Sequence, residues 1–352
     1  MPPGRSTRRG RPDALPAPPP PDLLESRLLV VTGKGGTGKT TVAASLALAA
    51  AHAGKRVLLA EVGRNEEAPR LLVPNAPVVG YEGRELVPGL RAMRIDPFDA
   101  LTDYLGLQIG HYVAERVVRN RGFRQLMDAT PGWRELIALG TVWHLERGRE
   151  NGRPTLDLIV VDAPATGHGL TFLDVPHVVA SAVRSGPLRR NAAEVERLLA
   201  DPQRTRLLPV ALAEELPVRE TAELIERLRR DRAIAVDRII VNAIEPPPLP
   251  DALRDLPSAI EAQTGYAPGP GASPSAATLA VCIRHRMARR ALHERHLTML
   301  GELTDLPLCP LPYLPSGVAG PRDLEALAPH VLAPPITADE AVKAHAARES
   351  AA

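Results

Sequence analysis

Short apolar runs rich in Val, Leu and Ile recur along the chain, each bounded by charged or turn-forming residues. Such runs predict strands that are buried on both faces. They lie at residues 27–32, 56–61, 156–162, 206–212, 238–242 and 306–308. Residues 40–52 have a helical composition and are followed by Gly54, a residue typical of the position after a helix. Strand, glycine-rich turn, helix and strand form one βαβ unit, so the pattern predicts an α/β fold with a mostly parallel sheet.

Longer stretches with a helical pattern separate the later strands. Residues 100–149 are predicted to be mostly helical with a break at Pro131-Gly132, and an amphipathic helix is predicted to begin at Pro217. Residues 278–300 predict a long helix whose polar side carries many Arg and His residues. We expect helices on both faces of the sheet, together with a helical subdomain made from roughly 98–153 and part of 173–205.

The remaining segments mark the limits of the domain. Residues 1–25 are rich in Pro and Arg and predict a disordered arm, because such a composition cannot bury a core. Residues 263–277 are rich in Gly, Pro, Ser and Ala and predict a mobile loop. We therefore expect one domain over residues 26–333 and a flexible tail at 334–352.

Composition narrows the class of protein. Of 352 residues, 44% are hydrophobic but only 3% are aromatic, so the core must be aliphatic. A formal net charge of +2 argues against nucleic-acid binding as the main role. Two distant cysteines exclude a disulfide framework and fit a reducing cytoplasm. No apolar run reaches the length of a transmembrane helix, so contact with a membrane would need a partner.

A phosphate-binding loop follows the first predicted strand. Residues 33–40 fit the pattern G-x-x-x-x-G-K-[ST], with a strand before it and a helix after it. Glycines allow backbone N–H groups to curl around phosphates, and the helix N-terminus adds partial positive charge. Lys39 is predicted to reach the β- and γ-phosphates of ATP, and the Thr40 hydroxyl to bind Mg²⁺. The predicted nucleotide-binding residues here are Gly33, Gly35, Gly36, Thr37, Gly38, Lys39, Thr40 and Thr41.

Lysine is rare in this chain and occurs only at positions 34, 39, 55 and 343. Two of these four lysines lie in the phosphate loop, which suggests that the loop needs ammonium groups rather than guanidinium groups. A loop with a second lysine resembles that of the MinD, ParA, nitrogenase iron protein and ArsA group. The resemblance implies that Lys34 crosses a dimer interface to the partner's nucleotide and takes part in catalysis with Lys39.

Later motifs resemble the ArsA branch, the arsenite-pump ATPases and the guided-entry ATPases that deliver tail-anchored proteins. Residues 162–170 (D-A-P-A-T-G-H-G-L) resemble the switch II of that family, which implies that Asp162 holds a water on Mg²⁺. Residues 94–97, 131–135 and 210–221 resemble further family segments in the right order. A strand that ends at Asn242 implies that this side chain hydrogen-bonds the adenine ring.

The chain also departs from that family. Register places Gly63 where the family carries an aspartate that orients the attacking water, and a glycine cannot do this. We expect Glu61 to substitute, with Glu66 or Glu67 as alternatives from the following loop, and hydrolysis to be slow. The chain has no C-x-x-C zinc motif, no thiol cluster for arsenite and few methionines, so neither known cargo is supported.

Three functions remain open at the level of sequence. The first is an ATP-hydrolysing dimeric ATPase that couples nucleotide state to binding of a partner or cargo. The second is a hydrolysis-impaired, nucleotide-gated subunit that pairs with an active paralogue, and Gly63 favours it. The third is a MinD/ParA-like positioning factor, which the apolar-poor C-terminus disfavours. The implied partners are a second copy or a paralogous ATPase, with an unknown protein cargo or membrane partner.

Overall fold

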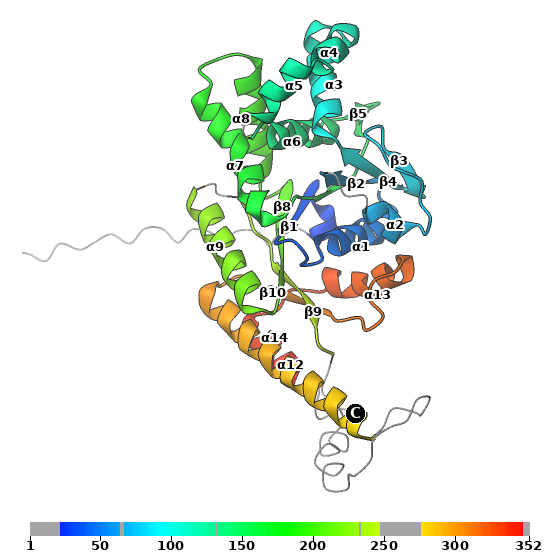
Figure 1. Ribbon diagram of the computed structural model, residues 1–352, viewed down its shortest axis with the longest axis vertical. Helices are drawn as coiled ribbons and strands as arrows, with labels where there is room; N and C mark the ends of the chain where they lie inside the picture. Colours follow the sequence, from blue (N-terminus) through cyan, green and yellow to red (C-terminus); the bar gives the residue numbers. More distant parts are fainter. Residues whose placement is uncertain (1–21, 64–66, 131, 232–233, 247–275, 348–352) are drawn as a thin grey trace, which may run out of the picture.

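An eight-stranded sheet forms the centre of the molecule (Figure 1). The structure is a computed structural model that describes residues 22–63, 67–130, 132–231, 234–246 and 276–347. The strand order is β10-β9-β8-β1-β7-β2-β4-β3, and every pairing is parallel except that of β3 with β4. The strands are β1 (Leu28–Gly33), β2 (Val57–Val62), β3 (Arg84–Val87), β4 (Leu90–Ile95), β7 (Leu158–Asp162), β8 (Thr205–Leu212), β9 (Ile239–Ile244) and β10 (Leu308–Pro312).

Helices cover both faces of this sheet, as the sequence predicts. Alternate residues of one strand enter different cores: Leu29 and Val31 pack with α1 and α13, whereas Leu28 and Val30 pack with α6, α8 and α9. A third core joins α9, α12 and α14 to β9 and β10. The helices named here are α1 (Lys39–His52), α6 (Trp133–Glu146), α8 (Pro187–Ala200), α9 (Glu215–Asp231), α12 (Ala276–Leu303), α13 (Pro321–Leu332) and α14 (Ala338–Ala347).

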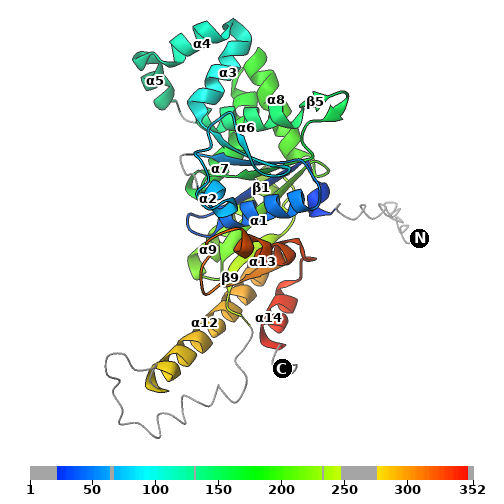
Figure 2. The same ribbon diagram turned by 90° about the vertical axis from the view of Figure 1, so that its right-hand side faces the viewer.

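Residues 97–200 form most of the helices at one end of the molecule. Figures 1 and 2 show them at the end of the molecule opposite to α12, which projects away from the sheet. The break predicted at Pro131-Gly132 lies between α5 and α6, although Pro131 is outside the described residues. The remaining elements are α2 (Ala68–Leu72), α3 (Pro97–Ile109), α4 (His111–Val118), α5 (Arg121–Asp128), α7 (Thr166–Ala182) and a small hairpin of β5 (Arg149–Glu150) and β6 (Arg153–Pro154).

Three expectations about segment boundaries were wrong. The chain is already ordered at η1 (Leu23–Glu25), where Leu23 and Leu24 join the main core. Residues 276 and 277 belong to α12 rather than to a loop, while 263–275 lie outside the described residues. The expected flexible tail contains α14, and Ala341 of this helix is buried against the third core. Small alanine side chains hid this contact, because they give a weak hydrophobic pattern.

Two strands of the main sheet were not predicted. β4 carries Arg91 and Arg94 among its apolar residues, and β3 is a short edge strand with exposed Arg84 and Glu85. Both therefore lack the uninterrupted apolar run that marks the central strands. The last strand was predicted at 306–308 but begins at Leu308.

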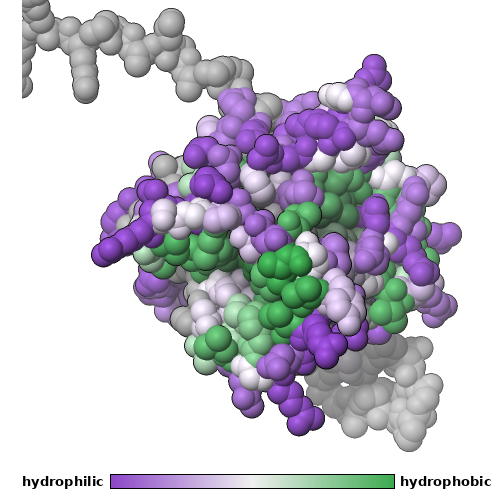
Figure 3. All heavy atoms as spheres, turned by 90° about the horizontal axis from the view of Figure 1, so that it is seen from above, coloured by the Kyte–Doolittle hydropathy of each residue, from purple (hydrophilic) through white to green (hydrophobic). Residues whose placement is uncertain are grey.

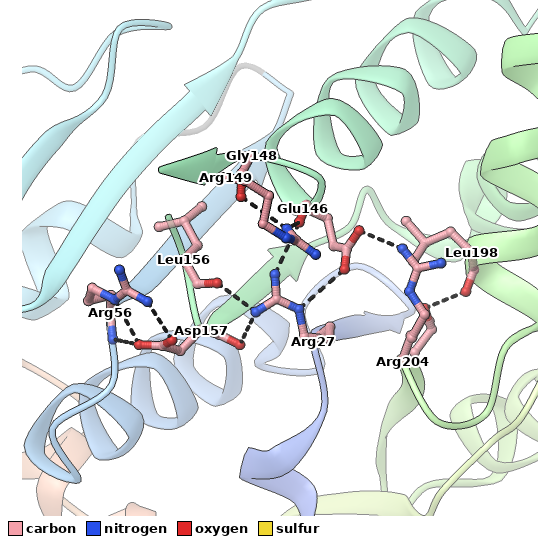
Figure 4. Close-up of polar contacts among 10 residues, drawn as sticks. Arg27, Arg56, Glu146, Gly148, Arg149, Leu156, Asp157, Leu198 and Arg204 are labelled. Carbon is pink, nitrogen blue, oxygen red and sulfur yellow. Dashed lines mark hydrogen bonds and ion pairs between the residues drawn. The ribbon is translucent and has the colours of Figure 1, made fainter. Parts of the chain in front are cut away.

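A buried ionic network ties several elements together at the amino-terminal ends of β1, β7 and β8 (Figure 4). Glu146, at the end of α6 and 1% exposed, accepts hydrogen bonds from Arg27 Nε at 3.2 Å and from Arg204 Nη2 at 2.5 Å. Arg27 also donates to the carbonyl oxygens of Leu156 and Asp157. The network therefore joins α6 to three central strands at the edge opposite to the phosphate loop.

Candidate nucleotide-binding site

The phosphate loop runs from the end of β1 to the start of α1. All six residues of β1 are buried, so the strand delivers the loop from the middle of the sheet. Gly38 is the N-cap of α1 and has no side chain to satisfy the first N–H groups of the helix. These N–H groups and the helix dipole would favour an anion at this turn, and phosphate binding here remains a prediction.

Two glycines of the loop cannot be replaced without a clash. Gly33 has φ of +145°, and a Cβ atom there would lie 2.2 Å from the carbonyl oxygen of Val210 in β8. Gly38 has φ of +92°, and its Cβ would lie 2.2 Å from Nδ2 of Asn242 in β9. The backbone of the loop therefore packs directly on two neighbouring strands, which fixes its curvature.

Lys39 lies inside the loop. Its Nζ donates a hydrogen bond of 3.0 Å to the carbonyl oxygen of Lys34, an acceptor that it shares with the Thr37 hydroxyl at 2.9 Å. Burial lowers the pKa of Lys39, whereas the carboxylates of Asp162 and Glu67 oppose this shift. A partly desolvated ammonium group inside a ring of backbone amides is suited to a polyphosphate.

Thr40 and Asp162 form the second part of the site. Asp162 ends β7, beside Val31 of β1, and its Oδ2 accepts a 2.6 Å hydrogen bond from Thr40 Oγ1. Its Oδ1 is buried and has no hydrogen-bond partner among the described residues. Burial raises the pKa of Asp162 to about 6, although the Thr40 bond and the charge of Lys39 lower it.

This pair of residues fits a magnesium ion. A hydroxyl oxygen and a carboxylate oxygen are hard ligands, and Mg²⁺ in nucleotide sites commonly binds one or two carboxylates, water and the substrate's phosphates. The described residues hold no cluster of three or more His, Cys, Asp or Glu side chains that could cage a metal without a substrate. The free Oδ1 of Asp162 is the buried acceptor that a metal-bound water needs.

Glu61 lies beside Asp162 at the end of β2, where the two residues are paired in register. Its Oε1 accepts hydrogen bonds from the backbone N–H groups of Glu67 at 3.2 Å and Ala68 at 3.0 Å, at the start of α2. Burial raises the pKa of Glu61 to about 7, and the nearby charge of Asp162 adds to the shift. Such a group can accept a proton near neutral pH.

The loop after β2 contains Gly63, at the position where the family carries an aspartate. Gly63 has φ of +129°, a conformation that side chains rarely adopt, and open space surrounds the position of a Cβ atom. Glu67, which the sequence offers as an alternative acid, is the N-cap residue of α2, and its charge affects Lys39 and Asp162. Glu66 and the side chain of His168 lie outside the described residues.

Asn242 lies against the phosphate loop. Its Nδ2 donates a 2.9 Å hydrogen bond to the carbonyl oxygen of Thr37, and its Oδ1 accepts one of 2.9 Å from the N–H of Ala243. The amide therefore holds β9 to the loop. Its contact with adenine remains a prediction. An adenine base bound there would compete for these hydrogen bonds of Asn242 or share them.

Lys34 does not point at the other loop residues. Its Nζ forms an ion pair of 2.7 Å with Oε1 of Glu220 in α9, and each side chain is about one-third exposed (37% and 36%). Sequence reasoning did not assign Glu220 to the site. Its only signal was its place in the segment 210–221 that resembles the ArsA family.

Comparison with known proteins agrees with this geometry. The family model described as anion-transporting ATPase matches residues 26–191. The ATPase BagA of Mycobacterium tuberculosis is 36% identical over 252 residues, which cover 69% of this chain and 69% of the relative. The chain belongs to the ArsA-type ATPase family. This membership confirms the resemblance found in the sequence, and the sheet confirms the predicted fold class.

Two less similar members of the ArsA-type family match this chain over different shares of its length. The ATPase get3 of Schizosaccharomyces japonicus is 27% identical over 353 residues, covering 87% of this chain and 94% of the relative. The arsenical pump-driving ATPase of Acidiphilium multivorum is 29% identical over 240 residues, covering 62% of this chain and 39% of the relative. The chain is thus an enzyme of an ATPase family, and its described helices include none able to span a membrane.

Proposed function

We propose that this ArsA-type ATPase binds ATP with Mg²⁺ at the loop of residues 33–41, hydrolyses it, and couples nucleotide state to dimerisation and partner binding. The observation that carries the proposal is the arrangement of Thr40 and Asp162, which share a hydrogen bond while one buried carboxylate oxygen stays without a partner. The fold brings this pair next to Lys39 and the start of α1.

Each part of the site has one task in this proposal. The amides of the loop and the ammonium group of Lys39 bind and orient the phosphates. Thr40 supplies a ligand to Mg²⁺, and Asp162 orients a water on it. Bound Mg²⁺ would neutralise charge on the transferred phosphoryl group.

Hydrolysis also needs a group that orients the attacking water. Glu61 is our candidate, because its pKa of about 7 allows proton transfer near neutral pH and two N–H groups at the start of α2 hold one of its oxygens. Glu67 is the alternative within the described residues. Gly63 supports the second function, a subunit with impaired hydrolysis that pairs with an active paralogue.

Dimerisation would give Lys34 its role. In the single chain Lys34 is paired with Glu220, so its charge is held near the surface, where a second subunit could approach. The resemblance to signature-lysine ATPases implies that Lys34 then contacts the partner's phosphates. The partner subunit can be a second copy or a paralogue, and we expect the complex to act in the cytoplasm.

A partner or cargo surface is available at the helical end of the molecule. Several large apolar side chains of α3, α4 and α5 are 47–71% exposed there, namely Leu107, Ile109, Val113 and Leu126. Figure 3 looks onto this end and shows hydrophobic surface among hydrophilic residues. Exposed apolar patches of this kind commonly mark interaction sites, which supports a protein or membrane-associated cargo.

Phosphate release from Mg²⁺-ATP tests the proposal directly. Lys39→Ala should reduce turnover at least 100-fold, because it removes the charge that stabilises the transferred phosphoryl group. Direct binding of a fluorescent ATP analogue should weaken in the same variant.

Glu61→Gln should lower turnover about 100-fold and leave that binding unchanged. Turnover that persists at wild-type rates in Glu61→Gln would leave Glu67 to be tested in the same way, whereas no turnover in the wild-type protein favours the second function.

A further inference from the structure

A cavity that is separate from the phosphate loop lies between the helical end and the sheet. It has a volume of about 610 Å³ and is lined mainly by α3, α6 and α8 with strands β2 and β4. Figure 1 shows these three helices together above the sheet. Pockets of 300–1,000 Å³ are the usual size for small-molecule sites. None of its lining residues belongs to the loop 33–41.

The floor of this cavity is part of the core. Leu58 of β2, Ala100 of α3 and Val195 of α8 line it and are 1–2% exposed. The cavity therefore reaches the sheet and is more than a surface depression. Voids much larger than a water molecule are few in natural cores, since each one costs packing energy. A pocket that reaches this core and also opens to solvent can admit a small molecule from solution.

Gly140 is an independent sign that the space is kept open. It lies in the middle of α6 and lines the cavity, and a Cβ atom added there would meet no atom within 4 Å. Glycine in a helix interior is unfavourable relative to alanine. Neither backbone geometry nor a close neighbour requires glycine at this position, so an advantage of the open volume explains it best.

The polar groups on the wall indicate what kind of molecule fits. The Tyr81 hydroxyl is within hydrogen-bonding reach of Asp103 and Thr141, and burial raises its pKa to about 12, so it stays uncharged. Asp103 is half-exposed at 53%, with His111 Nδ1 at 4.0 Å. Glu82 adds a second carboxyl group, while the guanidinium group of Arg91 donates to the carbonyl oxygen of Glu82. The acidic groups outnumber the permanent cation.

We propose that this cavity binds a small amphiphilic amine, with its apolar body against the core residues and its ammonium group at Asp103. An apolar body of about ten carbons fits the volume, and the carboxylate at the mouth favours a cation over an anion. The site is separate from the nucleotide site and does not depend on hydrolysis.

Calorimetric titration of the full chain tests this proposal with three probes that share one tail. n-Decylamine, n-decanol and decanoate are each titrated below their micellar concentrations. We expect decylamine to bind at one site, at least fivefold more tightly than decanol, and decanoate to bind more weakly than either. Trp143 lines the cavity, so its fluorescence should change with decylamine. Equal affinity for all three probes would overturn the assignment of an amine.

Three variants locate the site. Gly140→Met places a flexible side chain in the cavity and should weaken decylamine binding at least tenfold, while Gly140→Ala fills little volume and serves as the matched control. Asp103→Asn should bring decylamine affinity down to that of decanol and leave decanol unchanged. A thermal melt of each variant confirms folding. Undiminished decylamine binding by a folded Gly140→Met protein would exclude this cavity.

Discussion

Glu61 and Asp162 are neighbours at the ends of adjacent strands, and burial governs the charge of both. The protein fold removes them from water, so their pKa values rise to about 7 and about 6. Only hydrogen bonds and the Lys39 charge moderate this effect. Two carboxylic acids at a strand edge are therefore tuned for proton transfer and metal binding, at a cost in stability.

The cost in stability predicts a pH dependence for Glu61→Gln. Folding raises the pKa of Glu61 from 4.5 to about 7. The contribution of the protonated side chain to the free energy of unfolding is therefore complete below pH 4.5 and is lost as the pH rises through 7. Glutamine keeps the acceptor oxygen but cannot ionise. In urea unfolding, the variant should match the wild type near pH 4.5 and exceed it by up to about 3 kcal/mol at pH 8. A difference that does not change with pH would contradict this account.

Glu146 represents the opposite case, a buried acid that two arginines keep paired. Glu146→Ala leaves Arg27 and Arg204 without this carboxylate at the edge of the sheet and should lower the free energy of unfolding by about 3–5 kcal/mol. Glu25→Ala is the control, because the pair of Glu25 with Lys55 is largely exposed on its acidic side and should cost less than 1 kcal/mol. Urea unfolding at neutral pH measures both. Equal losses would mean that burial of the network contributes little.

At the scale of elements, close contacts between neighbouring elements decide where glycine is needed. The phosphate loop presses on β8 at Gly33 and on β9 at Gly38. The same principle applies to two helices, because a Cβ atom at Gly301 of α12 would lie 2.4 Å from Cβ of Ala338 in α14. The contact explains how a short, alanine-rich helix is held against the third core.

Two glycine-to-alanine changes in helices should therefore have opposite effects. Gly301→Ala should destabilise the protein by about 1–3 kcal/mol, since α14 must move away from α12. Gly140→Ala, with open space around the new methyl group, should stabilise it by up to about 1 kcal/mol. Thermal unfolding of both variants at one pH provides the comparison. Stabilisation by Gly301→Ala would show that α14 does not pack on α12 in solution.

At the scale of the whole molecule, the additional lysine of the phosphate loop, Lys34, forms an ion pair within its own chain. Lys34 and Glu220 are both about one-third exposed, so their interaction is worth less than about 1 kcal/mol and a competing triphosphate can replace it. This is what a lysine that changes partner on dimerisation requires.

Size measurements with and without Mg²⁺-ATP should reveal this exchange. We expect ATP to shift the wild-type protein towards a dimer and Lys34→Ala to stay monomeric, because the partner's phosphates lose a counter-charge. Glu220→Gln frees Lys34 and should lower the ATP concentration needed by up to about fivefold. Light scattering coupled to gel filtration provides the masses. A mass that ignores nucleotide in all three proteins would count against the dimer, or would require a paralogue to be supplied.

Local pattern was sufficient to predict the central strands, the phosphate loop and the family, because each depends on residues close together in the chain. Uninterrupted apolar runs specify buried parallel strands, and residues 33–40 combine glycines, a lysine and a hydroxyl in one turn. The glycine at position 63 was also visible in the sequence.

Tertiary structure alone decided the contacts between distant segments. It paired Lys34 with Glu220, left one oxygen of Asp162 unbonded, set Glu61 at the start of α2, and folded α14 onto α12. It also opened the cavity beside Gly140. Each of these depends on burial and on distances between residues far apart in sequence. The ionisation of a buried side chain and the packing energy lost at a void both depend on the surrounding atoms. Those atoms belong to segments far apart in the chain, so a local sequence pattern does not reveal them.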